Sequence, residues 1–124
     1  MKKAQVDTSL GEIEAKFAEI IWANAPIPSG ELVKLAAESP LRWKKSTTYT
    51  VLRRLCQKGL FKNEDGAVRI AVTRPEFNAL RSERFVEETF AGSLPQFLTA
   101  FSSQKKLSEE DLAALERFIE ENRR

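Results

Sequence analysis

The spacing of apolar residues predicts two helices in the first third of the chain. Between Ser9 and Trp22, apolar side chains recur every three to four residues, and Ser9 and Glu12 have the spacing of a capping box. Two prolines then interrupt the pattern in residues 23–28. A shorter helix is expected over residues 30–38, with Ser29 as its N-cap and Leu32, Leu35 and Ala36 buried.

Residues 43–59, WKKSTTYTVLRRLCQKG, predict a third helix with two different faces. Thr48, Val51, Leu52 and Leu55 form an apolar stripe, and Gly59 follows the last periodic residue, where it can end the helix. The opposite face carries hydroxyls, one tyrosine, two arginines and a glutamine, with no acidic residue. Such a face suits a DNA major groove, because short hydroxyls allow close approach and arginines reach guanine edges or phosphates.

The pattern changes to a strand period after Gly59. Residues 60–63 and 67–73 predict two strands around Glu64-Asp65-Gly66, and Asp-Gly is a strong hairpin signal. Val68, Ile70 and Val72 are expected on one apolar face, with Arg69 pointing outward. A hairpin after two short helices joined by a turn predicts a winged helix-turn-helix, although the same hairpin could simply close the core.

The last fifty or so residues predict three more amphipathic segments, at 76–91, 94–101 and 109–122, with a Ser108/Asp111 capping signature before the last. They hold six of the eight phenylalanines in the chain. Short helices cannot bury such an apolar load among themselves, so a symmetric dimer is expected, with packing onto the front half as the alternative. The expected dimer contacts are Phe85, Phe90, Leu94, Phe97, Leu98, Phe101, Leu112, Leu115, Phe118 and Ile119.

Charge divides the chain in the same way. Residues 1–75 hold 13 basic and 8 acidic side chains and residues 76–124 hold 7 and 10, which gives net charges of +5 and −3. Residues 42–63 contain seven basic side chains and no acidic one, whereas a solvated helix usually mixes its signs. We therefore expect the front half to meet a polyanion.

Composition excludes several classes of protein. The chain of 124 residues has no histidine and one cysteine, so neither a Cys/His zinc site nor a histidine-dependent catalytic site is expected, and no cofactor is expected. Cys56 lies beside the apolar stripe and is interpreted as a small buried hydrophobe, with a redox-sensing thiol as the alternative. No apolar run is long enough to cross a bilayer and no signal peptide is evident, so a cytoplasmic protein without membrane insertion is expected.

These elements, in this order, resemble the penicillinase repressor family, which includes methicillin-resistance and copper-transport repressors. The similar segments are LGEIEAKFAEIIW at 10–22, STTYTVLRRLCQKGLF at 46–61, the short hairpin, and the Phe-x-Gly-Ser stretch at 90–93. The resemblance covers nearly the whole chain, and TTYTVLRRL is its most specific part.

The resemblance implies a mainly α protein with a small β-hairpin: a winged-helix DNA-binding domain at 1–75 and a helical dimerisation domain at 76–124. It also implies a homodimer that binds a palindromic operator in double-stranded DNA and represses transcription. From the helix pattern and the resemblance together, the expected DNA contacts are Lys44, Lys45, Ser46, Thr47, Tyr49, Thr50, Arg53, Arg54, Lys62 and Arg69. The family position of Tyr49 is often an arginine, so the operator sequence is not transferred.

Two departures concern the inducing signal. Copper-sensing members carry a C-terminal cysteine pair, whereas this chain ends in FIEENRR, so copper release is not expected. Members that respond to β-lactams are inactivated by cleavage between an asparagine and a phenylalanine, and a membrane sensor protease is a possible partner in this response. In this chain, Ala100 precedes Phe101 at the comparable place. Cleavage at that bond is a hypothesis, and a winged-helix protein-interaction module without DNA binding is the alternative function.

Overall fold

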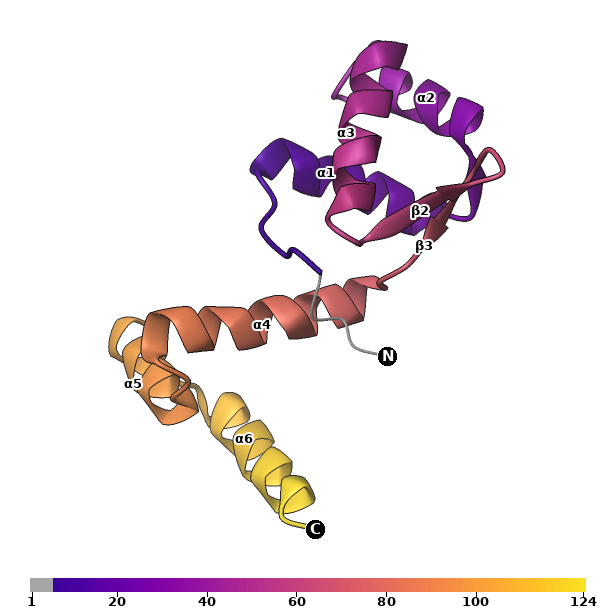
Figure 1. Ribbon diagram of the computed structural model, residues 1–124. Coiled ribbons are helices and arrows are strands. Elements are labelled where there is room, and N and C mark those ends of the chain that lie inside the picture. The colour runs from indigo at the N-terminus through magenta and orange to yellow at the C-terminus, as the bar shows by residue number, and fades with distance from the viewer. Residues whose placement is uncertain (1–5) are drawn as a thin grey trace. The chain divides into compact units, whose positions relative to one another are not determined.

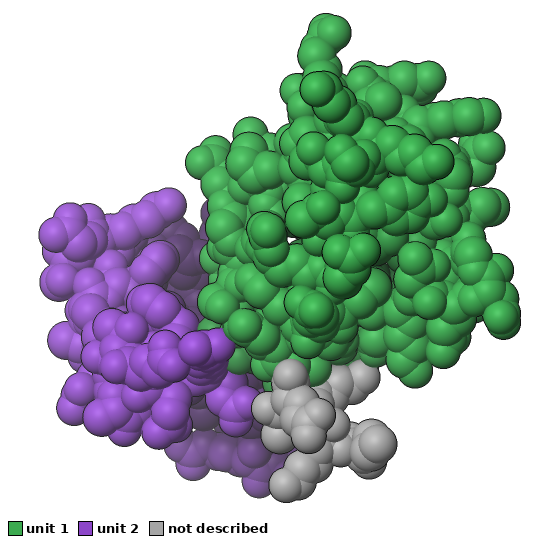
Figure 2. Space-filling model, turned by 45° about the horizontal axis from the view of Figure 1, so that its top comes forward, with its two compact units in different colours: residues 1–82 green, residues 83–124 purple. Residues whose placement is uncertain are grey.

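The computed structural model describes residues 6–124, which form two compact units divided after Ser82 (Figure 2). The first unit contains helices α1 (Glu12–Asn24), α2 (Ser29–Glu38) and α3 (Lys45–Gln57), strands β1 (Ile27–Pro28), β2 (Phe61–Glu64) and β3 (Ala67–Ile70), and the start of α4 (Arg74–Phe90). The second contains the rest of α4 with α5 (Leu94–Gln104) and α6 (Glu109–Asn122). The mainly helical fold with a small antiparallel sheet is the predicted fold class (Figure 1).

Helix α1 begins three residues later than the sequence pattern indicated. Gly11 occupies the N-cap and its N–H donates to the Glu14 carboxylate at 3.0 Å. The predicted Ser9/Glu12 capping box is wrong, because the Ser9 hydroxyl and N–H both donate to Asp7 Oδ1 instead. The cap at Gly11 therefore fixes Glu14 in the first turn of α1.

The turn between α2 and α3 fixes where α3 begins. Ser39 ends α2: its hydroxyl donates to the Ala36 carbonyl at 2.8 Å and accepts from the Leu41 N–H at 3.1 Å. Arg42 follows in the left-handed region, with φ of 51°. At the other end of α2, Ser29 is the first helical residue and Pro28 the cap, so the predicted N-cap at Ser29 is wrong by one position.

The hairpin joins a third strand that the sequence pattern did not predict. The strand order is β1-β3-β2, all antiparallel, and Ile27 of β1 pairs with Val68 of β3. Positive φ angles at Asp65 and Gly66, 52° and 75°, make the tight turn that the Asp-Gly signal predicted. The prolines at 26 and 28 argued against a strand in the sequence, because proline disrupts the interior of a sheet. Proline is tolerated at the edge of a sheet, which is where β1 lies.

The core of the first unit lies between α1, α2, α3 and the sheet. Its buried apolar side chains include the predicted Leu32, Ala36, Val51, Leu52 and Leu55, while Leu35 is half-buried against it. Trp22 closes one side: its Nε1–H donates to the Val72 carbonyl at 2.9 Å, and its ring lies 5.4 Å from that of Phe77 in α4. Val68 and Val72 are buried as expected, but Ile70, at the end of β3, is 38% exposed and does not share their environment.

The second unit consists of helices whose ends follow local signals. Helix α6 has the predicted bounds, and its capping box is confirmed: Asp111 N–H donates to the Ser108 hydroxyl at 3.0 Å. Ser93 caps α5 in the same way, accepting from the Gln96 N–H at 3.1 Å. Helix α5 continues to Gln104, beyond the expected end at Phe101.

Candidate nucleic-acid interface

Helix α3 presents two faces, as its sequence pattern predicts. Thr48 and Leu55 are fully buried, and the Thr48 hydroxyl donates to the Lys44 carbonyl at 3.3 Å, so its burial leaves no polar atom unsatisfied. At about 100° per residue, the side opposite this stripe is centred on Ser46, Thr50 and Arg53, and all three are exposed. The core therefore holds α3 by one face and leaves the opposite face open to solvent.

The start and the outer face of α3, together with the hairpin, carry cations that form no ion pair with any described residue. Within residues 6–124, Lys44, Lys45, Arg53, Lys62 and Arg69 are exposed and form no ion pair. Lysines on α1 and α2, by contrast, pair with acids one turn away, as Lys16 does with Glu12 and Lys34 with Glu31. Within the described part of the first unit, the unpaired positive charge therefore lies mostly on α3, the residue before it and the hairpin.

The hydroxyl groups of α3 differ in whether a hydrogen bond within the helix already engages them. The Thr50 hydroxyl donates to the Ser46 carbonyl at 2.9 Å, so its proton is already used and its oxygen can still accept. Thr47 and Ser46 are exposed in the first turn, which contains no acidic residue. This turn offers short side chains and the free N–H groups of a helix N-terminus on the same surface.

Tyr49 is less open than the sequence pattern suggested. Its ring is half-buried against the core, and its hydroxyl lies 3.1 Å from Ser29 Oγ at the start of α2. With Leu52, Arg53, Cys56 and Asn63 it lines a hollow of about 210 Å³ between α3 and β2. Tyr49 therefore joins α3 to α2 from the flank of the helix and not from the centre of its outer face.

Arg54 lies on the other flank of α3. The sequence of α3 contains no acidic residue, but an acid from another helix contacts this flank. Glu14 of α1 reaches α3, where its Oε2 accepts from Arg54 Nη1 at 3.2 Å and its Oε1 from Lys58 Nζ at 3.1 Å. The pKa of Glu14 is lowered, chiefly by the hydrogen bond from the Gly11 N–H and further by Lys58 and Arg54, against the opposing effect of burial. Sequence reasoning missed Glu14 because it lies 40 residues from Arg54 in the chain.

The hairpin places two cations opposite each other. Lys62 of β2 and Arg69 of β3 are direct partners in the antiparallel register, and both are exposed. Like charges in directly opposed positions destabilise a sheet. The pair is therefore expected to lower the stability of the hairpin, and it concentrates positive charge there.

Cys56 lies beside the apolar stripe of α3, but it is less deeply buried than the predicted small buried hydrophobe. The side chain is half-buried against the core, and burial raises the pKa of its thiol. A raised pKa keeps the sulfur protonated, and the thiol is the less reactive form.

The second unit exposes much of its apolar surface. Phe85, Phe90 and Phe97 form a three-ring cluster between α4 and α5, with centroids 5.7–6.1 Å apart, and Phe101 extends it. Six of the ten predicted dimer contacts are 41–55% exposed: Phe85, Leu94, Phe101, Leu112, Phe118 and Ile119. The other four are half-buried: Phe90, Phe97, Leu98 and Leu115.

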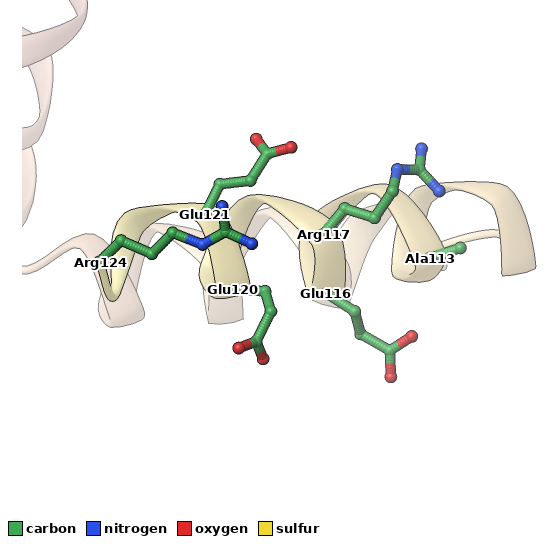
Figure 3. Close-up of a pocket in the computed structure, with 6 residues that line it drawn as sticks. All are labelled: Ala113, Glu116, Arg117, Glu120, Glu121 and Arg124. Carbon is green, nitrogen blue, oxygen red and sulfur yellow. The ribbon is translucent and has the colours of Figure 1, made fainter.

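Helix α6 also has a charged face, drawn in Figure 3, which borders a shallow hollow. Every lining residue comes from α6 or the residues just after it: Ala113, Glu116, Arg117, Glu120, Glu121 and Arg124. The carboxylates of Glu116 and Glu120 point away from the Arg117 guanidinium, so the side chains do not converge on a common point (Figure 3). This surface is a solvated helix face, opposite in character to the stripe of Leu112, Leu115 and Ile119.

The described residues hold neither a metal-binding cluster nor a membrane-spanning helix. Over residues 6–124, no group of His, Cys, Asp and Glu side chains is arranged to hold a metal ion. None of the helices in the same range has the length and apolar character needed to span a bilayer.

The family model of the penicillinase repressor matches residues 10–121, which is nearly the whole chain. The chain belongs to the penicillinase repressor family. No curated protein matches the sequence. Members of this family are regulators rather than enzymes, so membership supports a transcriptional repressor, and it agrees with the fold of the first unit.

Proposed function

We propose that the chain is a dimeric repressor that inserts α3 into the major groove of an operator and lays its hairpin along the neighbouring phosphates. The observation that carries this proposal is the set of exposed, unpaired cations on α3 and the hairpin, in a chain that belongs to a repressor family. A phosphate backbone would offset the charge of these cations and relieve the repulsion between Lys62 and Arg69.

The centre of the outer face of α3 is suited to reading bases. Ser46 and Thr50 are short enough to let the helix backbone approach base edges, and a threonine methyl group can contact the methyl group of thymine. Thr47 is also short and exposed, but it lies toward the flank of α3 that faces α1. Lys44, Lys45 and Arg53 are long, exposed cations on or beside this face, and we assign them chiefly to phosphates. Tyr49, tied to Ser29, would contact DNA from the flank of α3.

The apolar surface of the second unit supports a homodimer. Phe118 and Ile119 are 55% and 49% exposed on α6, and Phe101 is 45% exposed on α5. A two-fold pair is the commonest way to remove such a surface from water, and it would present two α3 helices to a palindromic site with half-sites about one helical turn, or a multiple of it, apart.

Relief of repression by proteolysis between Ala100 and Phe101 is a further part of the proposal. Both residues are exposed in α5, within the last turn or so before the helix ends at Gln104. A cut there would separate α6 from the aromatic cluster, and the loss of dimerisation would remove the linked second contact with DNA. Intact repressor in cells after derepression would contradict this step.

The proposal is tested by gel shift with the full chain and a duplex from the promoter of its own operon, titrated with salt. We expect retardation at low salt and a steep loss as salt rises, since each neutralised phosphate releases condensed counterions. Absence of retardation at low salt would refute DNA binding. Capture of a stable protein partner without nucleic-acid binding would instead favour a protein-interaction module.

A further inference from the structure

The Glu14 carboxylate links α1 directly to the DNA-facing helix. Its side chain is only 14% exposed and accepts from three groups: the Gly11 N–H at 3.0 Å, Lys58 Nζ at 3.1 Å and Arg54 Nη1 at 3.2 Å. Lys58 is 18% exposed and also donates to the Ser9 carbonyl, so it is held in place within this cluster. Arg54 differs, because half of its side chain remains exposed.

The position of Arg54 on α3 separates it from the base-reading centre. At about 100° per residue, Arg54 lies about 70° and Thr47 about 90° from the middle of the outer face, on the side that faces α1. Glu14 draws the guanidinium further toward α1. A residue on the flank of a helix in the major groove faces the wall of the groove, where the phosphates are.

Charge in the cluster still favours an anion. Glu14 is matched by Lys58, so the three side chains of Glu14, Lys58 and Arg54 together carry one net positive charge. Arg54 has five N–H donors in a fixed fork, and the contact with Glu14 engages one nitrogen of the guanidinium. The remaining donors are free to meet a phosphate, and a guanidinium already held in place loses less conformational freedom on binding.

We propose that Glu14 is a positioning residue that aims Arg54 at the DNA backbone, so that Arg54 contributes a phosphate contact and does not read a guanine. This inference rests on the proposed DNA binding and gives it a division of labour. The centre of α3 supplies sequence preference, and the Glu14–Arg54 pair supplies sequence-independent affinity.

The experiment compares the full chain with the variants E14Q, R54A and E14Q/R54A on two duplexes of equal length, one from its own promoter and one scrambled. Binding is followed by fluorescence anisotropy across a salt series. We expect R54A to weaken binding to both duplexes by about the same factor, on the order of tenfold, and to lower the salt slope by about one for each half-site. E14Q should weaken both by about threefold, and the double variant should be no worse than R54A.

Glu12→Gln is the matched control, since it removes the same charge from the same turn of α1 at a side chain that is 84% exposed. E14Q binding like E12Q, or losses from E14Q and R54A that simply add, would overturn the positioning role. A loss from R54A confined to the promoter duplex would overturn the phosphate contact and restore guanine reading.

A purely structural role for Glu14 is separated by stability and by a second variant. Thermal unfolding of E14Q identifies any loss of folded protein at the assay temperature. Glu14→Asp keeps the negative charge near Gly11 but shortens the side chain, so it should reproduce the E14Q loss of DNA affinity if reach to Arg54 is what matters. Failure of the unaltered chain to bind either duplex at low salt is a different result, and it would remove the proposed function together with this inference.

Discussion

The two units of this protein treat their apolar residues in opposite ways. In the described chain, all fourteen buried hydrophobic side chains lie between Phe17 and Phe77, whereas α5 and α6 bury none. The first unit encloses a core with a small sheet and three helices, while the second leaves large apolar side chains 41–55% exposed. Amphipathic helices alone therefore do not make a core, because each apolar stripe needs a facing surface.

The largest expected effect comes from the closed core. Phe17 is fully buried and its ring lies 5.0 Å from that of Trp43, so Phe17→Ala should cost about 3–5 kcal/mol of unfolding free energy. Urea unfolding followed by tryptophan fluorescence measures it. Ile13→Ala, on the same helix but 49% exposed, is the control and should cost less than about 1 kcal/mol. Equal losses would mean that α1 is not packed as described.

The exposed apolar surface of the second unit can be tested by introducing a charged side chain into it. Phe118→Glu places a carboxylate on the exposed apolar stripe of α6, and it should weaken dimerisation at least about tenfold in sedimentation equilibrium, because the interface would have to bury that charge. Glu120→Gln, on the charged face of the same helix, should leave dimerisation unchanged (Figure 3). A dimer unaffected by Phe118→Glu would exclude this stripe from the interface.

The hairpin of the first unit is expected to trade stability for affinity. Lys62→Gln or Arg69→Gln should reduce DNA affinity by about three- to tenfold and raise unfolding stability by about 0.2–1 kcal/mol, since each relieves the opposed cations. Anisotropy and urea unfolding check the two effects separately. Lys34→Gln, which removes a cation paired with Glu31 on α2, is the control. It should not raise the unfolding stability, and it should not reduce DNA affinity to a comparable extent.

The smallest expected effect is the loss, at acidic pH, of the contribution that Glu14 makes to stability. The pKa of Glu14 is lowered in the fold by the Gly11 N–H, Lys58 and Arg54, so its contribution to stability is present above the ordinary glutamate pKa. It should be lost as the pH falls through the lowered value, and the stability difference between the unaltered chain and E14Q should then vanish. Urea unfolding at a series of pH values measures this, and a difference that persists in strong acid would contradict it.

Much of the fold could be predicted because its signals are local. The apolar stripe of α3, the Asp-Gly turn and the Ser108 cap each depend on residues within one or two turns of each other, and the structure confirms all three. Strand β1 was missed because its partner Val68 lies far along the chain from Ile27 and its prolines argue against a strand. The cap at Gly11 was missed because Asp7 takes the hydrogen bonds of Ser9.

The sequence by itself determined that a basic, two-faced helix precedes a hairpin and that an apolar, acidic helical tail follows, since periodicity and charge are properties of order along the chain. Only the tertiary structure decided which of the side chains on α3 are free. It brings Ser29 to Tyr49 and Glu14 to Arg54. The reason is that packing α1 and α2 around α3 brings together side chains from distant positions, and no local pattern records that proximity.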